Sequence, residues 1–175
     1  MSDSSNPSNL DNFLKQLPSY IRIGQNLDQK YGKELGSTVR EAFIDDCSYI
    51  AKILNEEYTD VSNEIAISLT ASNLKIGPKI HYILFDTHYG LMIMDQHQVE
   101  NCWDERRIED LEDKVKLLHQ HGIIHGNLTL NHIFYSDGVI IDDYSHSYYS
   151  ISSYARKCDI DNLNRIKRTL EDKRH

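Results

Sequence analysis

The sequence LLHQHGIIHGNLTLNHIF at residues 117–134, followed by VIIDDY at residues 139–144, decides the fold. Gly122 ends the apolar helical pattern before it, since glycine readily adopts the left-handed conformation found just past a helix. A polar loop that opens with His125 comes next. Two short apolar runs, His132 to Tyr135 and Val139 to Ile141, flank a Ser-Asp-Gly turn and predict a hairpin. The stretch therefore predicts a helix, a polar loop, a hairpin and a carboxylate at a strand end, in this order.

Amphipathic helices are predicted on both sides of this stretch. The preceding segment has apolar residues at spacings of three and four, which gather on one face of a helix. These residues are Ile108, Leu111, Val115 and Leu118. The following segment, from about Cys158 to Leu170, repeats the pattern with Ile160, Leu163, Ile166 and Leu170. The second half of the chain is therefore expected to be mainly helical.

The first half has the pattern of an antiparallel meander. Its apolar runs alternate with turn residues, which predicts about five strands. The expected strands are Ile21–Ile23, Thr38–Ile44, Ser48–Leu54, Ile80–Phe85 and Leu91–Met94. A helix is predicted over Asn63–Asn73, with Ile65, Ala66 and Leu69 on its apolar face, and a short one over Leu10–Leu17. The polar stretch Asp95 to Arg107 is the expected boundary between the two halves.

Composition excludes several classes of protein. The 175 residues carry a net charge of -8, which disfavours binding to nucleic acid and to anionic membranes. The chain lacks a run of about 18 apolar residues and a readable export signal, so we expect a soluble, cytoplasmic protein. Cys47, Cys102 and Cys158 lie far apart, which predicts neither a disulfide framework nor a zinc site.

The order of elements around His125 resembles the phosphoryl-transfer site of the protein kinase superfamily. The polar loop is similar to the His-Arg-Asp catalytic loop, and the carboxylate after it to the Asp-Phe-Gly metal site. The run His125-Gly126-Asn127-Leu128-Thr129 is similar in particular to the loop of the small atypical kinases of the KEOPS tRNA-modification complex. The resemblance extends over about Ile21 to Leu170 and implies a kinase fold.

The resemblance implies a nucleotide site in the first half. Tyr49-Ile50-Ala51-Lys52 looks like the strand whose lysine neutralises nucleotide phosphates, and Glu64 is the candidate for the glutamate that pairs with Lys52. The segment Gly32 to Val39 occupies the place of the glycine-rich hairpin. Its implied nucleotide-binding residues are Gly32, Gly36, Ser37 and Val39. Met94 and Asp95 correspond to the strand end and hinge next to the adenine base.

The second half supplies the implied metal ligands and their supports. Asp142 corresponds to the metal carboxylate, and His132, with Asn131 beside it, to the second metal-binding position. His125 is expected to have a structural role. Asp159, at the start of the last helix, is expected to be buried and to accept hydrogen bonds from backbone amides around His125 and Gly126.

Several positions depart from the kinase pattern. Asn127 stands where an active kinase has its catalytic aspartate, and an amide cannot act as a carboxylate base. His132 replaces the metal-binding asparagine, and the metal motif reads Asp142-Asp143-Tyr144, without the apolar plug and the glycine. Glu34 and Ser37 stand at two glycine positions of the hairpin, unless Gly36 takes one of these positions in a shifted register. An Ala-Pro-Glu motif does not follow, and only 33 residues remain after Asp142.

We therefore predict an α+β protein of the minimal two-lobe kinase type. After a flexible N-terminus with a short helix at residues 1–19, residues 20–95 form the N-lobe, with a five-stranded antiparallel sheet and one helix. Residues 96–175 form a truncated, helical C-lobe.

Three functions stay open. The first is a degenerate kinase or pseudokinase that binds ATP and Mg²⁺ and acts as a regulatory or binding module, with a protein partner. The second is an active minimal Ser/Thr protein kinase, because phosphoryl transfer depends mainly on positioning and charge neutralisation. The third is a small-molecule phosphotransferase of the aminoglycoside kinase type, whose loop also has the His-Gly-x-Leu sequence. Asn127 favours the first function.

Overall fold

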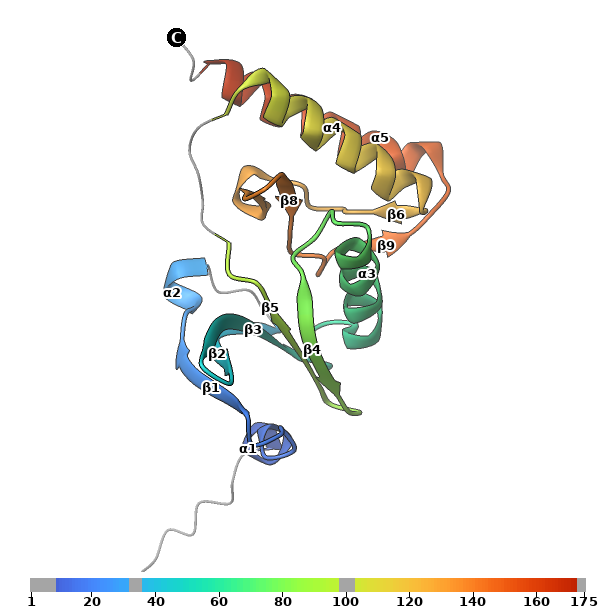
Figure 1. Cartoon of the computed structure of the whole chain (residues 1–175). Helices are drawn as coiled ribbons and strands as arrows, with labels where there is room; N and C mark the ends of the chain where they lie inside the picture. Colours follow the sequence, from blue (N-terminus) through green and yellow to red (C-terminus); the bar gives the residue numbers. More distant parts are fainter. Residues whose placement is uncertain (1–8, 32–35, 98–102, 173–175) are drawn as a thin grey trace, which may run out of the picture. The chain divides into compact units, whose positions relative to one another are not determined.

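A computed structural model describes residues 9–31, 36–97 and 103–172 of the chain. The chain divides into two compact units (Figure 1). The first comprises residues 1–61 and 80–96, and the second comprises residues 62–79 and 97–175. Gly32, which the sequence places in the nucleotide site, lies outside the described residues.

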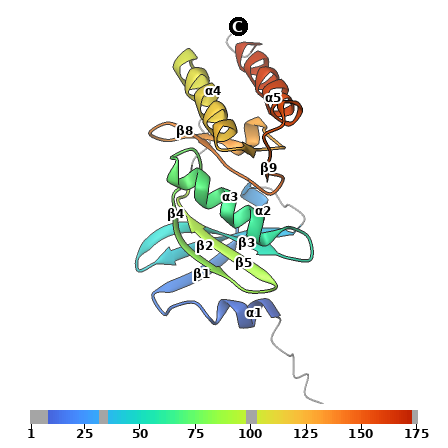
Figure 2. The same cartoon turned by 90° about the vertical axis from the view of Figure 1, so that its right-hand side faces the viewer.

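The first unit is built on a five-stranded antiparallel sheet with the strand order β1-β2-β3-β5-β4 (Figure 2). The strands are β1 (Ile21–Asn26), β2 (Ser37–Ile44), β3 (Cys47–Asn55), β4 (Ile80–Phe85) and β5 (Tyr89–Met94). Two short helices, α1 (Asn9–Leu14) and α2 (Asp28–Tyr31), accompany it. Because β3 pairs with a strand on each side, it is the central strand, and five consecutive residues of it are buried.

One face of this sheet packs into the core of the first unit. Successive side chains of a strand point to opposite faces, so residues at alternate positions share a face. Ala51 and Ile53 of β3 lie in the core with Leu91 and Ile93 of β5, and α1 adds Phe13 to the same cluster. Phe13 is buried and its ring centroid lies 5.5 Å from that of Tyr89. The helix therefore covers the face on which Ala51 and Ile53 lie.

The second unit combines helices with two short hairpin-like pairs (Figures 1 and 2). Its helices are α3 (Val61–Asn73), α4 (Glu105–Gln120) and α5 (Ser153–Asp172), with a single 3₁₀ turn, η1 (Leu130–His132). The strands are β6 (Ile123–Ile124), β7 (Ile133–Tyr135), β8 (Val139–Ile141) and β9 (Tyr148–Tyr149). Strand β6 pairs with β9, and β7 pairs with β8.

A single cluster of buried apolar residues joins these elements. Helix α4 contributes the four residues that its periodicity predicts, and α5 contributes Leu163, Ile166 and Leu170. The N-terminus of α4 is capped by Asp104, whose carboxylate accepts a hydrogen bond from the Arg107 amide at 2.8 Å. Gly122 follows α4 with a positive φ of 73°, as predicted for the end of this helix.

The structure differs from the predicted elements in three places. Helix α3 packs with the second unit, through Ile67 and Ala71, and its residues Ala66 and Leu69, predicted on the apolar face, are exposed. The buried face of α3 includes polar residues, so hydrophobicity alone did not identify it. The first helix ends at Leu14, and the last begins at Ser153, five residues before the apolar pattern starts. The β6–β9 pair was not predicted, because two-residue strands leave no alternating pattern to detect.

Candidate functional site

The polar loop after β6 is fixed by the carboxylate of Asp159 in α5. Its Oδ2 accepts a hydrogen bond from the His125 amide at 2.8 Å, and its Oδ1 accepts one from the Gly126 amide at 3.0 Å. His119 Nε2 lies 3.0 Å from Oδ2 as well. Asp159 is buried, and a buried carboxylate is stable only when donors of this kind surround it. The expectation that Asp159 braces this loop is confirmed.

These partners also set the charge of Asp159. Burial by itself raises the pKa of the carboxyl group. The hydrogen bonds from His119, His125 and Gly126 outweigh this effect, so the pKa of Asp159 lies below its ordinary value. The loop therefore rests on an ionised carboxylate at neutral pH.

Gly126 is required by the shape of the loop. Its φ is 78°, in the left-handed region that disfavours side chains. A Cβ atom at this position would lie 2.4 Å from the carbonyl oxygen of His146. A side chain at position 126 would therefore clash with the backbone at His146, which explains why this position is glycine.

His125 is buried and acts as a neutral connector. Its Nδ1 accepts a hydrogen bond from the Asn127 amide at 3.3 Å, so the proton is on Nε2, which donates to the carbonyl of Asp142 at 2.9 Å. Burial lowers the pKa of His125 and keeps the ring uncharged. Ser147 Oγ donates to the His125 carbonyl at 2.9 Å. This geometry agrees with the structural role expected for His125.

Asn127, at the position of the catalytic aspartate, is half-buried and held by its backbone. Its amide bonds to His125, and its carbonyl accepts a hydrogen bond from His132 Nδ1 at 2.9 Å. The loop conformation at residue 127 is therefore fixed on both sides. The group presented there is an amide, which can donate or accept a hydrogen bond but does not take up a proton.

The structure brings His132 and Asp143 together. Nε2 of His132 lies 3.4 Å from Oδ2 of Asp143, and both side chains are largely buried, with 17% and 11% of their surface exposed. Asp143 has a φ of 62°, an uncommon value for an aspartate. Asp143 thus combines an unusual backbone conformation with a contact to the ring of His132.

Asp142 and Asn131, the other predicted metal ligands, have different surroundings. The amide of Asp142 donates to the carbonyl of His132 at 2.8 Å, and its Oδ1 accepts the hydrogen bond of the Asp143 amide at 2.7 Å. Asn131 lies exposed in η1. Sequence reasoning did not select Asp143 as a ligand. Asp142 and Asp143 are adjacent, so the sequence does not determine which of the two corresponds to the metal-binding aspartate.

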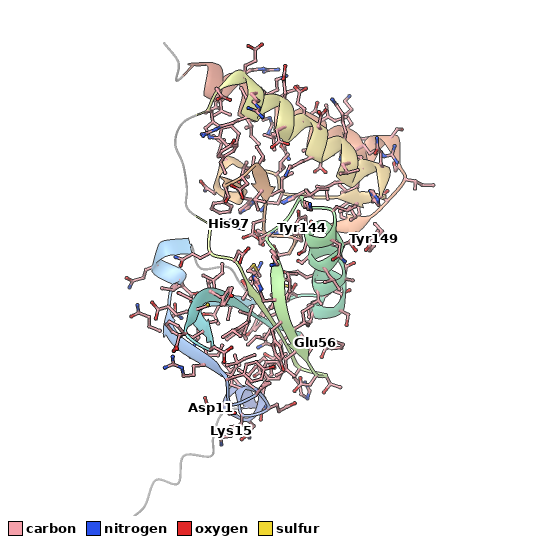
Figure 3. The ribbon with its side chains drawn as sticks, in the orientation of Figure 1. Asp11, Lys15, Glu56, His97, Tyr144 and Tyr149 are labelled. Carbon is pink, nitrogen blue, oxygen red and sulfur yellow. The ribbon has the colours of Figure 1, made fainter. Side chains whose placement is uncertain are left out.

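Tyr144 supplies a buried aromatic ring at the next position (Figure 3). Its ring centroid lies 5.3 Å from that of His125, and its hydroxyl donates to the carbonyl of Ile141 at 2.9 Å. Burial, followed by the charge of Asp142, raises the pKa of the Tyr144 hydroxyl well above its ordinary value. Tyr144 therefore places a buried aromatic ring one residue after the position where the kinase pattern has its apolar plug.

In the first unit, four predicted nucleotide-binding residues share one face of the sheet. Val39 pairs with Lys52, and Lys52 pairs with Met92, so these side chains lie in one row. Ser37 and Met94 are at positions of the same parity in β2 and β5 and lie on the same face. This face is opposite to the one that α1 covers. Lys52 is buried at its centre, on the central strand.

The hairpin between β1 and β2 has features that the glycine pattern did not predict. Gly36 has a φ of 91°, and a Cβ atom there would lie 2.5 Å from the Cβ of Tyr58, so both the backbone conformation and the packing favour glycine at this position. Asp28 accepts hydrogen bonds from the Val39 amide at 2.7 Å and from the Thr38 hydroxyl at 2.9 Å. The carboxylate thus fixes the start of β2, next to Val39.

The two remaining predicted residues are Asp95 and Glu64. Asp95, after β5, has its Oδ1 2.7 Å from Nε2 of His81 in β4. Glu64 is buried on α3, in the second unit. The pairing of Glu64 with Lys52 stays a prediction.

Comparisons with known proteins give a result only at the level of structure. Neither the protein-family models nor the curated proteins contain a match to the chain. Among solved structures, the chain is similar to the kinase PK-1 of Cydia pomonella granulovirus, with a TM-score of 0.57 and 21% sequence identity. The similarity covers 82% of this chain and 60% of that kinase, so the chain spans about three fifths of its length. The fold class predicted from the sequence is confirmed: the chain has a protein-kinase-like fold, with a five-stranded antiparallel sheet in one unit and a helical second unit.

Proposed function

We propose that the chain is a degenerate protein kinase that binds ATP with a divalent cation and acts as a regulatory or binding module. One observation carries this proposal. Asp159 holds the start of the loop 125–132 through the amides of His125 and Gly126, and this loop has Asn127 where the kinase pattern has its catalytic aspartate. A loop of this shape without its base supports binding more than turnover.

The proposed phosphate-binding group is the ammonium of Lys52. Lys52 lies on the central strand in one row with Val39 and Met92, and an ammonium group forms charge-assisted hydrogen bonds with phosphate oxygens. Val39, Met92 and Met94 on the same face add apolar surface of the kind that binds an adenine ring. Ser37 and Gly36 lie at the start of β2 and complete the proposed site.

The proposed cation site lies in the loop around residue 132. The residues that would hold the cation are Asp142, Asn131 and His132, together with Asp143, whose Oδ2 lies 3.4 Å from Nε2 of His132. In this register Asp143-Tyr144-Ser145 occupies the place of Asp-Phe-Gly, with the buried Tyr144 as its aromatic member. A bound cation would neutralise phosphate charge.

An active kinase is the second candidate, and one observation favours it. Asp159 accepts both backbone hydrogen bonds that hold the start of the loop. In phosphoryl transfer, positioning and charge neutralisation supply most of the catalysis. General-base assistance is typically worth about 10² to 10⁴ in rate. An enzyme with Asn127 in place of the base would therefore be slow.

A protein is the proposed partner. The net charge of -8 disfavours nucleic acid and anionic lipid surfaces. Within residues 9–31, 36–97 and 103–172, none of the helices has the length and apolar composition needed to cross a bilayer.

Turnover of ATP by the wild type and by Asn127→Asp tests this proposal. We expect very slow or undetectable turnover in the wild type, and an increase in the variant, whose carboxylate can take a proton. Turnover by the wild type at ordinary kinase rates, about 1 to 100 per second, would favour the active kinase.

A further inference from the structure

We propose that the chain forms a two-fold dimer in which β4 of one copy pairs antiparallel with β4 of a second copy. The pairing extends the sheet of the first unit into the sheet of the partner subunit. The dimer needs neither nucleotide nor cation, so it is independent of the proposed function.

Strand β4 is an edge strand whose sequence offers no protection against pairing with another chain. Within the described residues, its ladder partner is β5 alone. From Tyr82 to Phe85 the pairing with β5 is regular, so the backbone groups on the outer side form a row of hydrogen-bond donors and acceptors. Proteins usually block such a row with charged residues, above all lysine, or with proline. The strand sequence IHYILF contains no Asp, Glu, Lys, Arg or Pro.

Strand β1, at the opposite edge of the sheet, has the protective features that β4 lacks. Its sequence IRIGQN contains Arg22, whose side chain is exposed. Its register with β2 shifts between Ile23 and Asn26, which interrupts the row of backbone groups. In β4 the register shifts only at the start of the strand, between Ile80 and Tyr82. Of the two edges, β4 is therefore the one suited to accept another strand.

Apolar side chains of β4 expose surface that a further strand would cover. The exposed fraction of Phe85 is 61%, the largest among the large apolar and aromatic side chains described in the first unit. Tyr82, Ile83 and Leu84 are half-buried, whereas the residues Gly90–Met94 of β5 are buried. Contacts between apolar and aromatic side chains on neighbouring strands stabilise a strand pair. A strand added at the outer edge would therefore bury more of the apolar surface of β4.

The charges at the two ends of β4 favour a second copy of the chain as the partner. Lys79 directly precedes the strand and Asp86 directly follows it, and both side chains are exposed. In an antiparallel pair with two-fold symmetry, Lys79 of each copy comes to the end of the strand at which Asp86 of the partner subunit lies. The amides of His88 and Tyr89 donate to the Asp86 carboxylate at 2.7 and 2.9 Å and hold it in place. The strand is therefore complementary to itself in hydrogen bonding and in charge.

Two-fold symmetry also restricts the register of the pair. Residues directly opposite each other in an antiparallel pair point to the same face of the sheet, so one residue must lie opposite its own copy. Centred on Ile83, the pair places Tyr82 opposite Leu84 of the partner subunit and uses the regular part of the strand. An extended segment of another protein is the rival occupant of this edge, and it would not depend on both end charges.

Sedimentation equilibrium of the full chain without nucleotide, at concentrations up to about 100 µM, tests the dimer. Salt at about 0.15 M screens the repulsion between two copies that each carry a charge of -8. Phe85→Lys places a charge at the outer edge of β4, and its matched control is Gln25→Lys, at an exposed position of β1. Lys79→Glu brings like charges together at both ends of the pair, and its control is Lys15→Glu, at another exposed lysine. Circular dichroism and thermal unfolding establish that each variant is folded.

We expect the wild type to dimerise in this concentration range. Dimerisation should weaken at least roughly tenfold in Phe85→Lys and about threefold in Lys79→Glu, because exposed ion pairs contribute less than apolar contacts, and should stay unchanged in the two controls. Hydrogen exchange of the wild type should become slower with increasing concentration at residues 82–85 and not in β1.

A wild type that stays monomeric would overturn the dimer and leave this edge to another protein. Equal dimerisation in Phe85→Lys and Gln25→Lys, or slower exchange confined to segments other than β4, would overturn the pairing through β4. Equal dimerisation in Lys79→Glu and Lys15→Glu would overturn the antiparallel arrangement, since the end charges would then not meet.

Discussion

The carboxylate of Asp159 accepts a hydrogen bond from the backbone amide of His125 across 34 residues of sequence. Together with the bond to Gly126, it ties the start of α5 to the loop that presents Asn127. The carboxylate of Asp159 is thus the single buried group that connects the last helix to this loop. The strength of its two hydrogen bonds determines how rigidly the loop is held.

Replacement of Asp159 by alanine should therefore destabilise the protein. Loss of the carboxylate leaves the buried His125 amide, the part-buried Gly126 amide and His119 without their acceptor, at a cost of roughly 1 to 3 kcal/mol in the free energy of unfolding. Urea denaturation measures this difference. Asp161→Ala, an exposed position of the same helix, is the matched control and should change stability by less than about 0.5 kcal/mol. Equal losses in the two variants would contradict the role of Asp159.

Acid should destabilise the protein through His125. Its folded pKa is lowered by burial, which outweighs the hydrogen bond to Asp142 and the charge of Asp159. Between this folded pKa and the ordinary value of about 6.5, the unfolded chain binds more protons than the folded chain. The contribution of neutral His125 is therefore complete above about pH 6.5 and falls as the pH falls through this window.

Urea denaturation at several pH values tests this contribution. The free energy of unfolding of the wild type should decrease between about pH 6.5 and the acid limit of folding. His125→Gln carries no titrating ring, so its curve should fall less steeply over the same window. Parallel curves for wild type and variant would assign the acid sensitivity to other groups.

Tyr144→Phe tests how much the buried hydroxyl group of Tyr144 contributes to stability. The substitution keeps the ring against His125 and removes the hydrogen bond to the Ile141 carbonyl, so we expect a loss of about 1 kcal/mol in unfolding free energy. Tyr144→Ala, which also empties the space of the ring, should cost about 3 to 5 kcal/mol. Similar small losses in both variants would show that the ring does not fill the core.

The sequence predicted those features that depend on local pattern or on a strong physical requirement. The periodicity of Ile108, Leu111, Val115 and Leu118 identified α4 because an amphipathic helix leaves a clear repeat. Burial of Asp159 followed from the resemblance and from the need of a carboxylate for donors. The five strands of the sheet were found from their apolar runs, although their ends moved by a few residues.

Other features depend on tertiary contacts that leave no local signal. The adjacent aspartates Asp142 and Asp143 have the same chemistry, and the features that distinguish them, the positive φ of Asp143 and its contact with His132, exist only in the folded chain. Helix α3 has apolar residues on more than one face, so its packing with the second unit was not evident from the sequence. The role of Asp28 depends on a contact with Val39, eleven residues away.

Lys52 gives the most direct test of the central claim that the chain binds ATP. Calorimetry with ATP and a divalent cation compares the wild type, Lys52→Ala and the control Lys15→Ala, an exposed lysine directly after α1. A charge-assisted contact worth about 1.5 to 3 kcal/mol predicts roughly 10- to 100-fold weaker binding in Lys52→Ala. Binding by the wild type and by Lys15→Ala, with this loss in Lys52→Ala, is the predicted result. Equal affinity in all three proteins, or a wild type that does not bind ATP, would contradict the account.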